Sequence, residues 1–133
     1  MKTKLALTME DARVAAAAAE KEARSNGWAV TIAVCDDGGH LLWLQRMDGA
    51  NAMSAQIAPE KARTAVLARK PSKALEDMIN GGRYAALAMP VVPLEGGELI
   101  MAEGDIVGGV GVSGVMAPQD GQCARAGVKA IQP

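Results

Sequence analysis

The chain has 133 residues, enough for one domain with a hydrophobic core, and we expect a single domain over residues 1–133. Its 14 basic and 15 acidic residues are scattered and give a formal net charge of −1, which argues against a nucleic-acid partner. No apolar run approaches the roughly 20 residues that span a bilayer, and Met1–Leu7 lack the apolar core of a signal peptide, so we expect a cytoplasmic protein without membrane contact.

The first third of the chain predicts a helix followed by a hairpin. Thr8 is a suitable N-cap for an alanine-rich amphipathic helix that ends at Asn26-Gly27. Alternating apolar residues then predict a strand over 28–35. Asp36–Gly39 supplies a hairpin turn, and the return strand runs from His40 to about Met47.

Two helices are expected next. Proline costs about 3 kcal/mol inside a helix, so the second helix is expected to begin near Pro59, with residues 54–58 as a separate turn. Pro71 ends this helix, and Ser72 is the N-cap of a short third helix that closes at Asn80–Gly82.

The last third returns to strands. Three segments, 91–94, 98–101 and 106–113, are separated by short glycine turns, which favours antiparallel pairing. Pro118 marks the start of a final helix. The order α-β-β-α-α-β-β-β-α, with strands in meander blocks, predicts an α+β fold in which helices flank a five-stranded antiparallel sheet.

The composition indicates what fills the core. Hydrophobic residues make up 50% of the chain, but aromatic residues only 2%, with no Phe. Small side chains let helices lie close to a sheet, and their modest burial per residue favours a homo-oligomer. Cys35 and Cys123 are far apart without a CxxC motif and are expected to be free, buried thiols.

The segment Gly109–Gly114 matches the pattern G-x-G-x-x-G but does not predict a dinucleotide site. Such a site needs a strand-to-helix turn within a βαβ unit, whereas these glycines alternate with valines inside a strand. Gly109, Gly111 and Ser113 share one face, which lets a helix, another subunit or a flat ligand approach closely. These alternatives leave room for a ligand near Ser113 and Gly114, where the strand ends.

His40 is the only histidine of the chain. It is a candidate proton-transfer group or axial heme ligand, and the alternative is a partly exposed hydrogen-bonding residue. One histidine without a Cys or His partner argues against a structural zinc site, so no metal site is expected apart from a possible heme iron.

Lys61 and Arg63 are candidate ligand-binding residues of the second helix. Two positions apart, they point about 160° away from one another, so one side chain faces solvent while the other faces the body. Lys61 would need an anionic partner there, either Asp36, Glu95 or a ligand carboxylate, unless it snorkels to solvent. Asp120 lies in the first turn of the last helix, where complementing the helix dipole explains it.

Eight segments along nearly the whole chain form a recognisable set when taken in order: Val34–Leu42, Arg46–Ala50, Lys61–Ala65, Pro71-Ser72, Glu95–Gly97, Gly109–Gly114, Gln119-Asp120 and Ala124–Gly127. Together they resemble one family, the heme-binding-protein-like GlcG/HbpS family, in which the same motifs occur in this order. That family is related to the C-terminal domain of PduO-type corrinoid adenosyltransferases.

The resemblance implies a profilin-like antiparallel sheet with helices, homo-oligomers, and heme or tetrapyrrole binding in some members. Other members are encoded among catabolic genes. Two positions depart from the family pattern: Pro59 interrupts a helix that usually reads through, and Gly121 stands where a polar residue is common and is expected to loosen the last helix. No residue of this chain matches an axial heme ligand of the family. His40 is therefore a candidate on chemical grounds alone, and Met47 and Met116 are the next candidates.

Three functions follow as hypotheses. The first is a homo-oligomeric cytoplasmic binder of a small planar or anionic ligand such as heme, with a site between the second helix and the sheet edge. The second is a catabolic enzyme that transfers protons on a carboxylate-bearing intermediate. The third is a purely structural oligomerisation domain. The binder would use Lys61, Arg63, His40, Asp36, Glu95 and the backbone at Ser113 and Gly114, and the enzyme would hold the carboxylate with Lys61 or Arg63 and use Asp36, His40 or Glu95 as acid or base.

Overall fold

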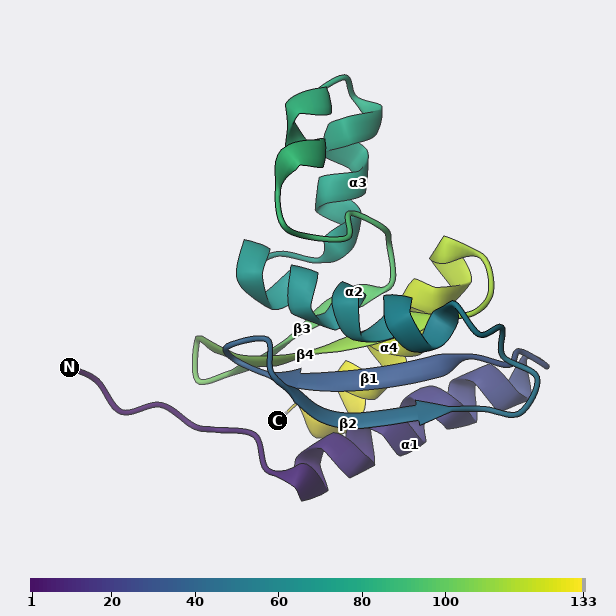
Figure 1. The fold of residues 1–133 in the computed structure, drawn as a ribbon. Helices are drawn as coiled ribbons and strands as arrows, with labels where there is room; N and C mark the ends of the chain where they lie inside the picture. Colours follow the sequence, from purple (N-terminus) through teal and green to yellow (C-terminus); the bar gives the residue numbers. More distant parts are fainter. Residues whose placement is uncertain (133) are drawn as a thin grey trace.

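A computed structural model describes residues 1–132, and within them one antiparallel sheet has four strands in the order β2-β1-β4-β3 (Figure 1). The strands are β1 (Thr31–Asp36), β2 (Leu41–Arg46), β3 (Gly97–Ala102) and β4 (Asp105–Ser113). The long strand β4 is central, because it pairs with β1 on one side and β3 on the other. β2 and β3 are therefore the two edges.

Helices cover both faces of the sheet (Figure 1). Two of them, α1 (Met9–Ser25) and α4 (Ala117–Ile131), pack on one face, and α2 (Ser54–Ala68) lies across the other. On the α2 side, α3 (Ser72–Asn80) and the 3₁₀ helix η1 (Tyr84–Ala88) form an arm that stands away from the sheet (Figure 1).

Helix α1 begins where the sequence predicts. The Thr8 side chain accepts a hydrogen bond from the Asp11 backbone, and the Asp11 carboxylate accepts one from the Thr8 backbone, which is a complete capping box. The alanine face of α1 is fully buried against α4 and the sheet. The larger side chains of this core come from the strands: Ile32, Val34, Ile100, Val110 and Val112.

On the opposite face, the glycines of β4 place α2 in direct contact with the sheet. A Cβ atom on Gly111 would overlap the carbonyl oxygen of Ala58 and lie 2.5 Å from the backbone nitrogen of Ala62. A Cβ on Gly109 would lie 2.9 Å from the Ala62 carbonyl oxygen. The sequence left a helix, another subunit or a flat ligand as partners of this glycine face, and in the structure the partner is helix α2.

Helix α2 does not begin at Pro59, as expected, but runs through it from Ser54. The first turn is fixed by other contacts. The Ser54 backbone N–H donates to Asn51 Oδ1 at 2.9 Å, and the buried Ser54 hydroxyl bonds Thr31 Oγ1 at 2.7 Å. These contacts offset the one hydrogen bond that proline removes.

The expected fifth strand, residues 91–94, is not present in the described chain. Pro90 and Pro93 have no N–H to donate to a ladder. The Val92 N–H donates instead to Thr64 Oγ1 at 2.9 Å, and the Leu94 N–H donates to the Val92 carbonyl at 2.9 Å. This segment is therefore an irregular connection that packs on α2.

The contact between α2 and β4 predicts a large steric penalty for Gly111→Ala. The new methyl group would meet backbone atoms of α2, so the helix must move, and we expect a loss of at least about 3 kcal/mol in the free energy of unfolding. Gly104→Ala is the control, because a Cβ there meets nothing within 4 Å and only its φ of +81° is unfavourable. That variant should lose about 1–2 kcal/mol. Denaturant unfolding compares the two, and equal losses would contradict the steric account.

Candidate functional site

Lys61 and Asp120 form a buried ion pair that joins α2 to α4. Lys61 Nζ donates to Asp120 Oδ2 at 2.9 Å and to the Val112 carbonyl oxygen at 3.1 Å. Both side chains are 3% exposed. The anionic partner of Lys61 is thus Asp120, and not Asp36, Glu95 or a ligand as the sequence suggested. Asp120 likewise does more than complement the helix dipole.

Two glycines make room for this pair. A Cβ on Gly96, whose φ is +133°, would lie 2.8 Å from Lys61 Nζ. A Cβ on Gly97 would overlap the Lys61 carbonyl oxygen. The glycines after Glu95 therefore bring the start of β3 against α2.

The pair is satisfied internally. Asp120 Oδ1 accepts the Val115 N–H at 3.1 Å, so both carboxylate oxygens have donors. Burial raises the pKa of Asp120, and the hydrogen bond from Lys61 opposes that shift. Lys61 can hold a ligand carboxylate only if this pair opens.

A second charged group surrounds Arg125 of α4. Its guanidinium lies 3.2 Å from Glu98 Oε1 and 3.9 Å from Glu95 Oε2. Burial raises the pKa of Glu98. Gly121 does not loosen α4 as expected: it is buried, and a Cβ there would lie 2.9 Å from Glu95 Oε2, so the glycine makes room for that carboxylate.

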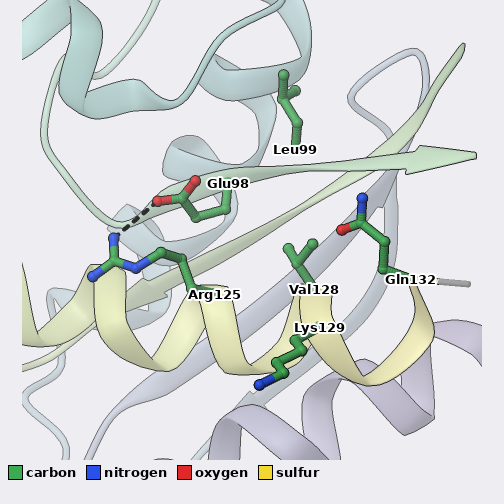
Figure 2. Close-up of a pocket in the computed structure, with 6 residues that line it drawn as sticks. All are labelled: Glu98, Leu99, Arg125, Val128, Lys129 and Gln132. Atoms are coloured by element: carbon green, nitrogen blue, oxygen red, sulfur yellow. Dashed lines mark hydrogen bonds and ion pairs between the residues drawn. The ribbon is translucent and has the colours of Figure 1, made fainter. Parts of the chain in front are cut away.

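Beside this cluster, a groove of about 440 Å³ runs between the outer edge of β3 and α4 (Figure 2). Val128 of α4 contributes an apolar wall, and Glu98, Arg125, Lys129 and Gln132 surround it with polar groups. Leu99 also lines the groove, but its side chain points from β3 toward the α2 face of the sheet (Figure 2). We call this surface the β3–α4 groove. Sequence reasoning missed Glu98 and Arg125, because only tertiary structure brings a strand carboxylate to a helix guanidinium.

His40 and Asp36 lie in the β1–β2 hairpin, which is shaped by one carboxylate. Asp36 Oδ1 accepts the N–H groups of Gly38 and His40, each at 2.9 Å. His40 is exposed, and Leu41 beside it is 52% exposed. Arg63 reaches this hairpin, because a Cβ on Gly39 would lie 3.0 Å from Arg63 Cγ.

The structure places the candidate residues in two separate regions. Asp36 pairs with Gly108, whereas Ser113 pairs with Thr31 at the other end of β1. The five residue-to-residue steps from Thr31 to Asp36 span about 17 Å. His40, Asp36 and Arg63 are therefore near one end of the sheet, and Lys61, Glu95, Ser113 and Gly114 are near the other.

The other candidate ligand atoms are dispersed. Met116 is 68% exposed at the N-cap of α4, and Met47 packs partly buried against the core.

Both cysteines are free and buried, and burial raises the pKa of Cys35 to about 12 and of Cys123 to about 11. Within residues 1–132, no three His, Cys, Asp or Glu residues are grouped to hold a metal ion. No helix of the described chain is long and apolar enough to cross a membrane.

The fold and its polar clusters define a small α+β domain with an internal ion pair and open polar surfaces at its edges. Residues 7–129 match the model of the family described as haem degrading protein HbpS-like. The chain therefore belongs to the HbpS-like family, which confirms the resemblance found in the sequence.

Individual relatives agree with this assignment. Protein GlcG of Escherichia coli K12 is 49% identical over 114 residues, which cover 85% of each chain. The crystal structure of a double mutant of Streptomyces reticuli HbpS has a TM-score of 0.90 and 34% identity, and covers 100% of this chain and 92% of that one. The PduOC–heme complex has a TM-score of 0.86 and 30% identity, and covers 96% of both chains.

The buried pair predicts strong coupling between Lys61 and Asp120. Lys61→Met leaves a buried carboxylate without its cation and should cost about 3–5 kcal/mol in the free energy of unfolding. Adding Asp120→Asn removes that charge, so the double variant should be more stable than the Lys61→Met single variant. A double-mutant cycle by denaturant unfolding should give a coupling of about 0.5–3 kcal/mol.

The exposed pair Lys73–Asp77 on α3 is the matched control, with side chains 51% and 56% exposed. Substitutions to Met and Asn there should change stability by less than about 0.5 kcal/mol each. Purely additive losses at Lys61 and Asp120 would contradict the pair's role.

The raised pKa of Glu98 predicts that the free energy of unfolding depends on pH. Its pKa in the folded protein is raised above the usual 4.5, so the folded state holds this proton more tightly than the unfolded chain. The resulting stabilisation is complete below pH 4.5 and is lost as the pH rises through the folded-state pKa. The unfolding free energy of the wild type minus that of Glu98→Gln should therefore fall with rising pH. Denaturant unfolding between about pH 4 and pH 8 measures this difference, and a rising difference would contradict the sign.

Proposed function

We propose that this protein is a cytoplasmic, homo-oligomeric binder of a small planar ligand, with heme or a related tetrapyrrole as that ligand. The observation that carries the proposal is the likeness to the PduOC–heme complex, which is 30% identical over 96% of both chains. Heme binding in that relative supports the same ligand class here.

The β1–β2 hairpin supplies the chemistry that such a ligand needs. His40 is the one histidine of the chain, and its exposed imidazole is a suitable axial ligand for heme iron. Leu41 and Leu44 on β2 are 52% and 45% exposed and offer apolar surface for a macrocycle. The Cγ of Arg63 lies beside the same hairpin. Its guanidinium donates to the Pro90 carbonyl at 3.2 Å and lies 3.5 Å from Glu60 Oε2, and the side chain is 39% exposed, so a propionate would bind it by competing with Glu60.

The Lys61 end of the sheet supports the proposal less. Lys61 Nζ is paired with Asp120, and the carbonyl of Val112 is bonded to the same group. In the catalytic alternative, Arg63 would act with His40 or Asp36 at the hairpin, or Lys61 with Glu95 at the other end, but Lys61 is already paired with Asp120. A binder that uses the hairpin needs neither the ion pair to open nor the two ends to meet.

Two further features support the oligomer and the compartment. The arm formed by α3 and η1 exposes large apolar side chains, of which Tyr84 is 70% and Leu87 is 65% exposed. Such surface is a common sign of a protein partner. The two free cysteines suit a reducing compartment such as the cytoplasm.

The proposal predicts a saturable response to hemin. Titration of the purified protein should give a Soret shift at one heme per subunit or per dimer, and His40→Ala should weaken binding by about tenfold or more, because an axial bond is lost. Absorbance spectroscopy follows both proteins.

Lys21→Ala, an exposed substitution on α1, is the control and should bind hemin as the wild type does. A response that never saturates would overturn heme as the ligand. Saturable binding that His40→Ala leaves unchanged would retain heme but remove the hairpin as its site.

A further inference from the structure

Glu95 is a largely buried carboxylate whose oxygens accept no hydrogen bond from residues 1–132. Its side chain is 8% exposed, and Arg125 Nη1 lies 3.9 Å from Oε2, which is too long for a hydrogen bond. Within the same residues, no enclosed side-chain nitrogen or oxygen lacks a hydrogen bond, so the oxygens of Glu95 reach the surface. A buried stem therefore presents an acceptor-only carboxylate to a ligand.

Glu98 and Arg125 lie beside this carboxylate and have unused hydrogen-bonding capacity. Arg125 donates to Glu98 Oε1 at 3.2 Å through Nη1, the same nitrogen that faces Glu95 (Figure 2). Among the described residues, Glu98 Oε2 and the Nε and Nη2 atoms of Arg125 have no hydrogen-bond partner. The Arg125 side chain is 54% exposed, so its free nitrogens are open to a ligand.

Gly121 of α4 allows the opposite charges to lie this close together. A Cβ atom there would lie 2.9 Å from Glu95 Oε2 and 3.0 Å from Arg125 Nη1. Both atoms are at the ends of flexible side chains, so a larger residue would displace the two charges rather than the helix. The glycine therefore determines where the carboxylate and the guanidinium meet.

The β3–α4 groove continues from these charges along α4. Val128 lies on the same side of the helix as Arg125 and forms the apolar wall, and Gln132 lies farther along (Figure 2). The volume of about 440 Å³ is within the range of about 300–1,000 Å³ that is typical of small-molecule sites. The surface thus has a charged head and an apolar wall.

The free donors and acceptors define the class of ligand. An ammonium group has three N–H donors and no acceptor, which matches the oxygens of Glu95 and Glu98. A carboxylate matches the two free nitrogens of Arg125. Because Glu95 and Arg125 are 3.9 Å apart, the ammonium and the carboxylate must be close together in one molecule. A metal ion fits less well, because residues 1–132 group no three His, Cys, Asp or Glu side chains to hold one.

We propose that Glu95, Glu98 and Arg125 form a binding site for a small α-amino acid with an apolar side chain. The two glutamates accept the ammonium, Arg125 holds the carboxylate, and the side chain of the ligand lies in the β3–α4 groove against Val128. The site borders the edge strand β3, whereas the His40 hairpin joins the opposite edge strand β2, so heme and the amino acid bind independently.

L-leucine and two analogues test this site. Isothermal titration calorimetry of the full chain should show saturable binding of L-leucine. Isocaproate lacks the ammonium and isoamylamine lacks the carboxylate, so each should bind about tenfold more weakly or worse. Glu95→Gln keeps the shape of the side chain but removes the charge that faces the ammonium, and it should weaken L-leucine binding by about tenfold or more.

Two further variants control for charge and for folding. Glu103→Gln makes the same change on the exposed turn after β3, at the other end of that strand, and should bind L-leucine as the wild type does. Gly121→Ala keeps all three charges but displaces Glu95 and Arg125, so it should also weaken binding. Circular dichroism reports whether each variant folds, and if Glu95→Gln does not, Gly121→Ala decides.

The outcomes separate the site from its ligand. Titration with L-leucine that never saturates, or binding that Glu95→Gln leaves unchanged, overturns the site. An analogue that binds as tightly as L-leucine overturns the α-amino acid as its ligand. Weaker binding in Glu95→Gln and Gly121→Ala, with full binding in Glu103→Gln, supports the proposal. The hemin titration tests the proposed function separately from all of these results.

Discussion

The close contact between α2 and the glycine face of β4 is the one on which the rest of the structure depends. Because Gly109 and Gly111 have no Cβ, the backbone of α2 lies directly on the sheet. Because α2 lies so close to the sheet, the Lys61 side chain extends past the end of β4 and reaches the carboxylate of Asp120 in α4, on the opposite face of the sheet. The glycine pattern that resembles a nucleotide motif is therefore the reason why two helix layers are joined by a charge pair.

We expect the ion pair itself to add specificity more than stability. Removing two charges from water costs several kcal/mol, and their attraction and hydrogen bonds return about the same amount. Its effect is on register: Lys61 reaches Asp120 only when α2, β4 and α4 are correctly aligned, and Gly96 and Gly97 leave the space that Lys61 occupies. The polar layer made by Lys61, Asp120 and the neighbouring Glu95 is a fixed part of the fold.

The sequence predicted what local rules determine. The capping box at Thr8 and the alanine periodicity place α1, and the glycine turn places the β1–β2 hairpin. Predictions from local rules were wrong where contacts between distant residues outweigh a local preference. Pro59 is tolerated because Ser54 is held by Thr31, 23 residues earlier, and residues 91–94 leave the sheet because Thr64 captures the Val92 N–H. The partner of Lys61 lies 59 positions away, and only the fold selects Asp120 from the acidic residues of the chain.

The strand order places the proposed heme site away from the central ion pair. The hairpin with His40 joins β1 to the edge strand β2, whereas Lys61 contacts the Val112 carbonyl and Asp120 near the other end of β1. A ligand at His40 would therefore bind without opening the ion pair, and the pair would keep α2 and α4 aligned whether or not the hairpin is occupied.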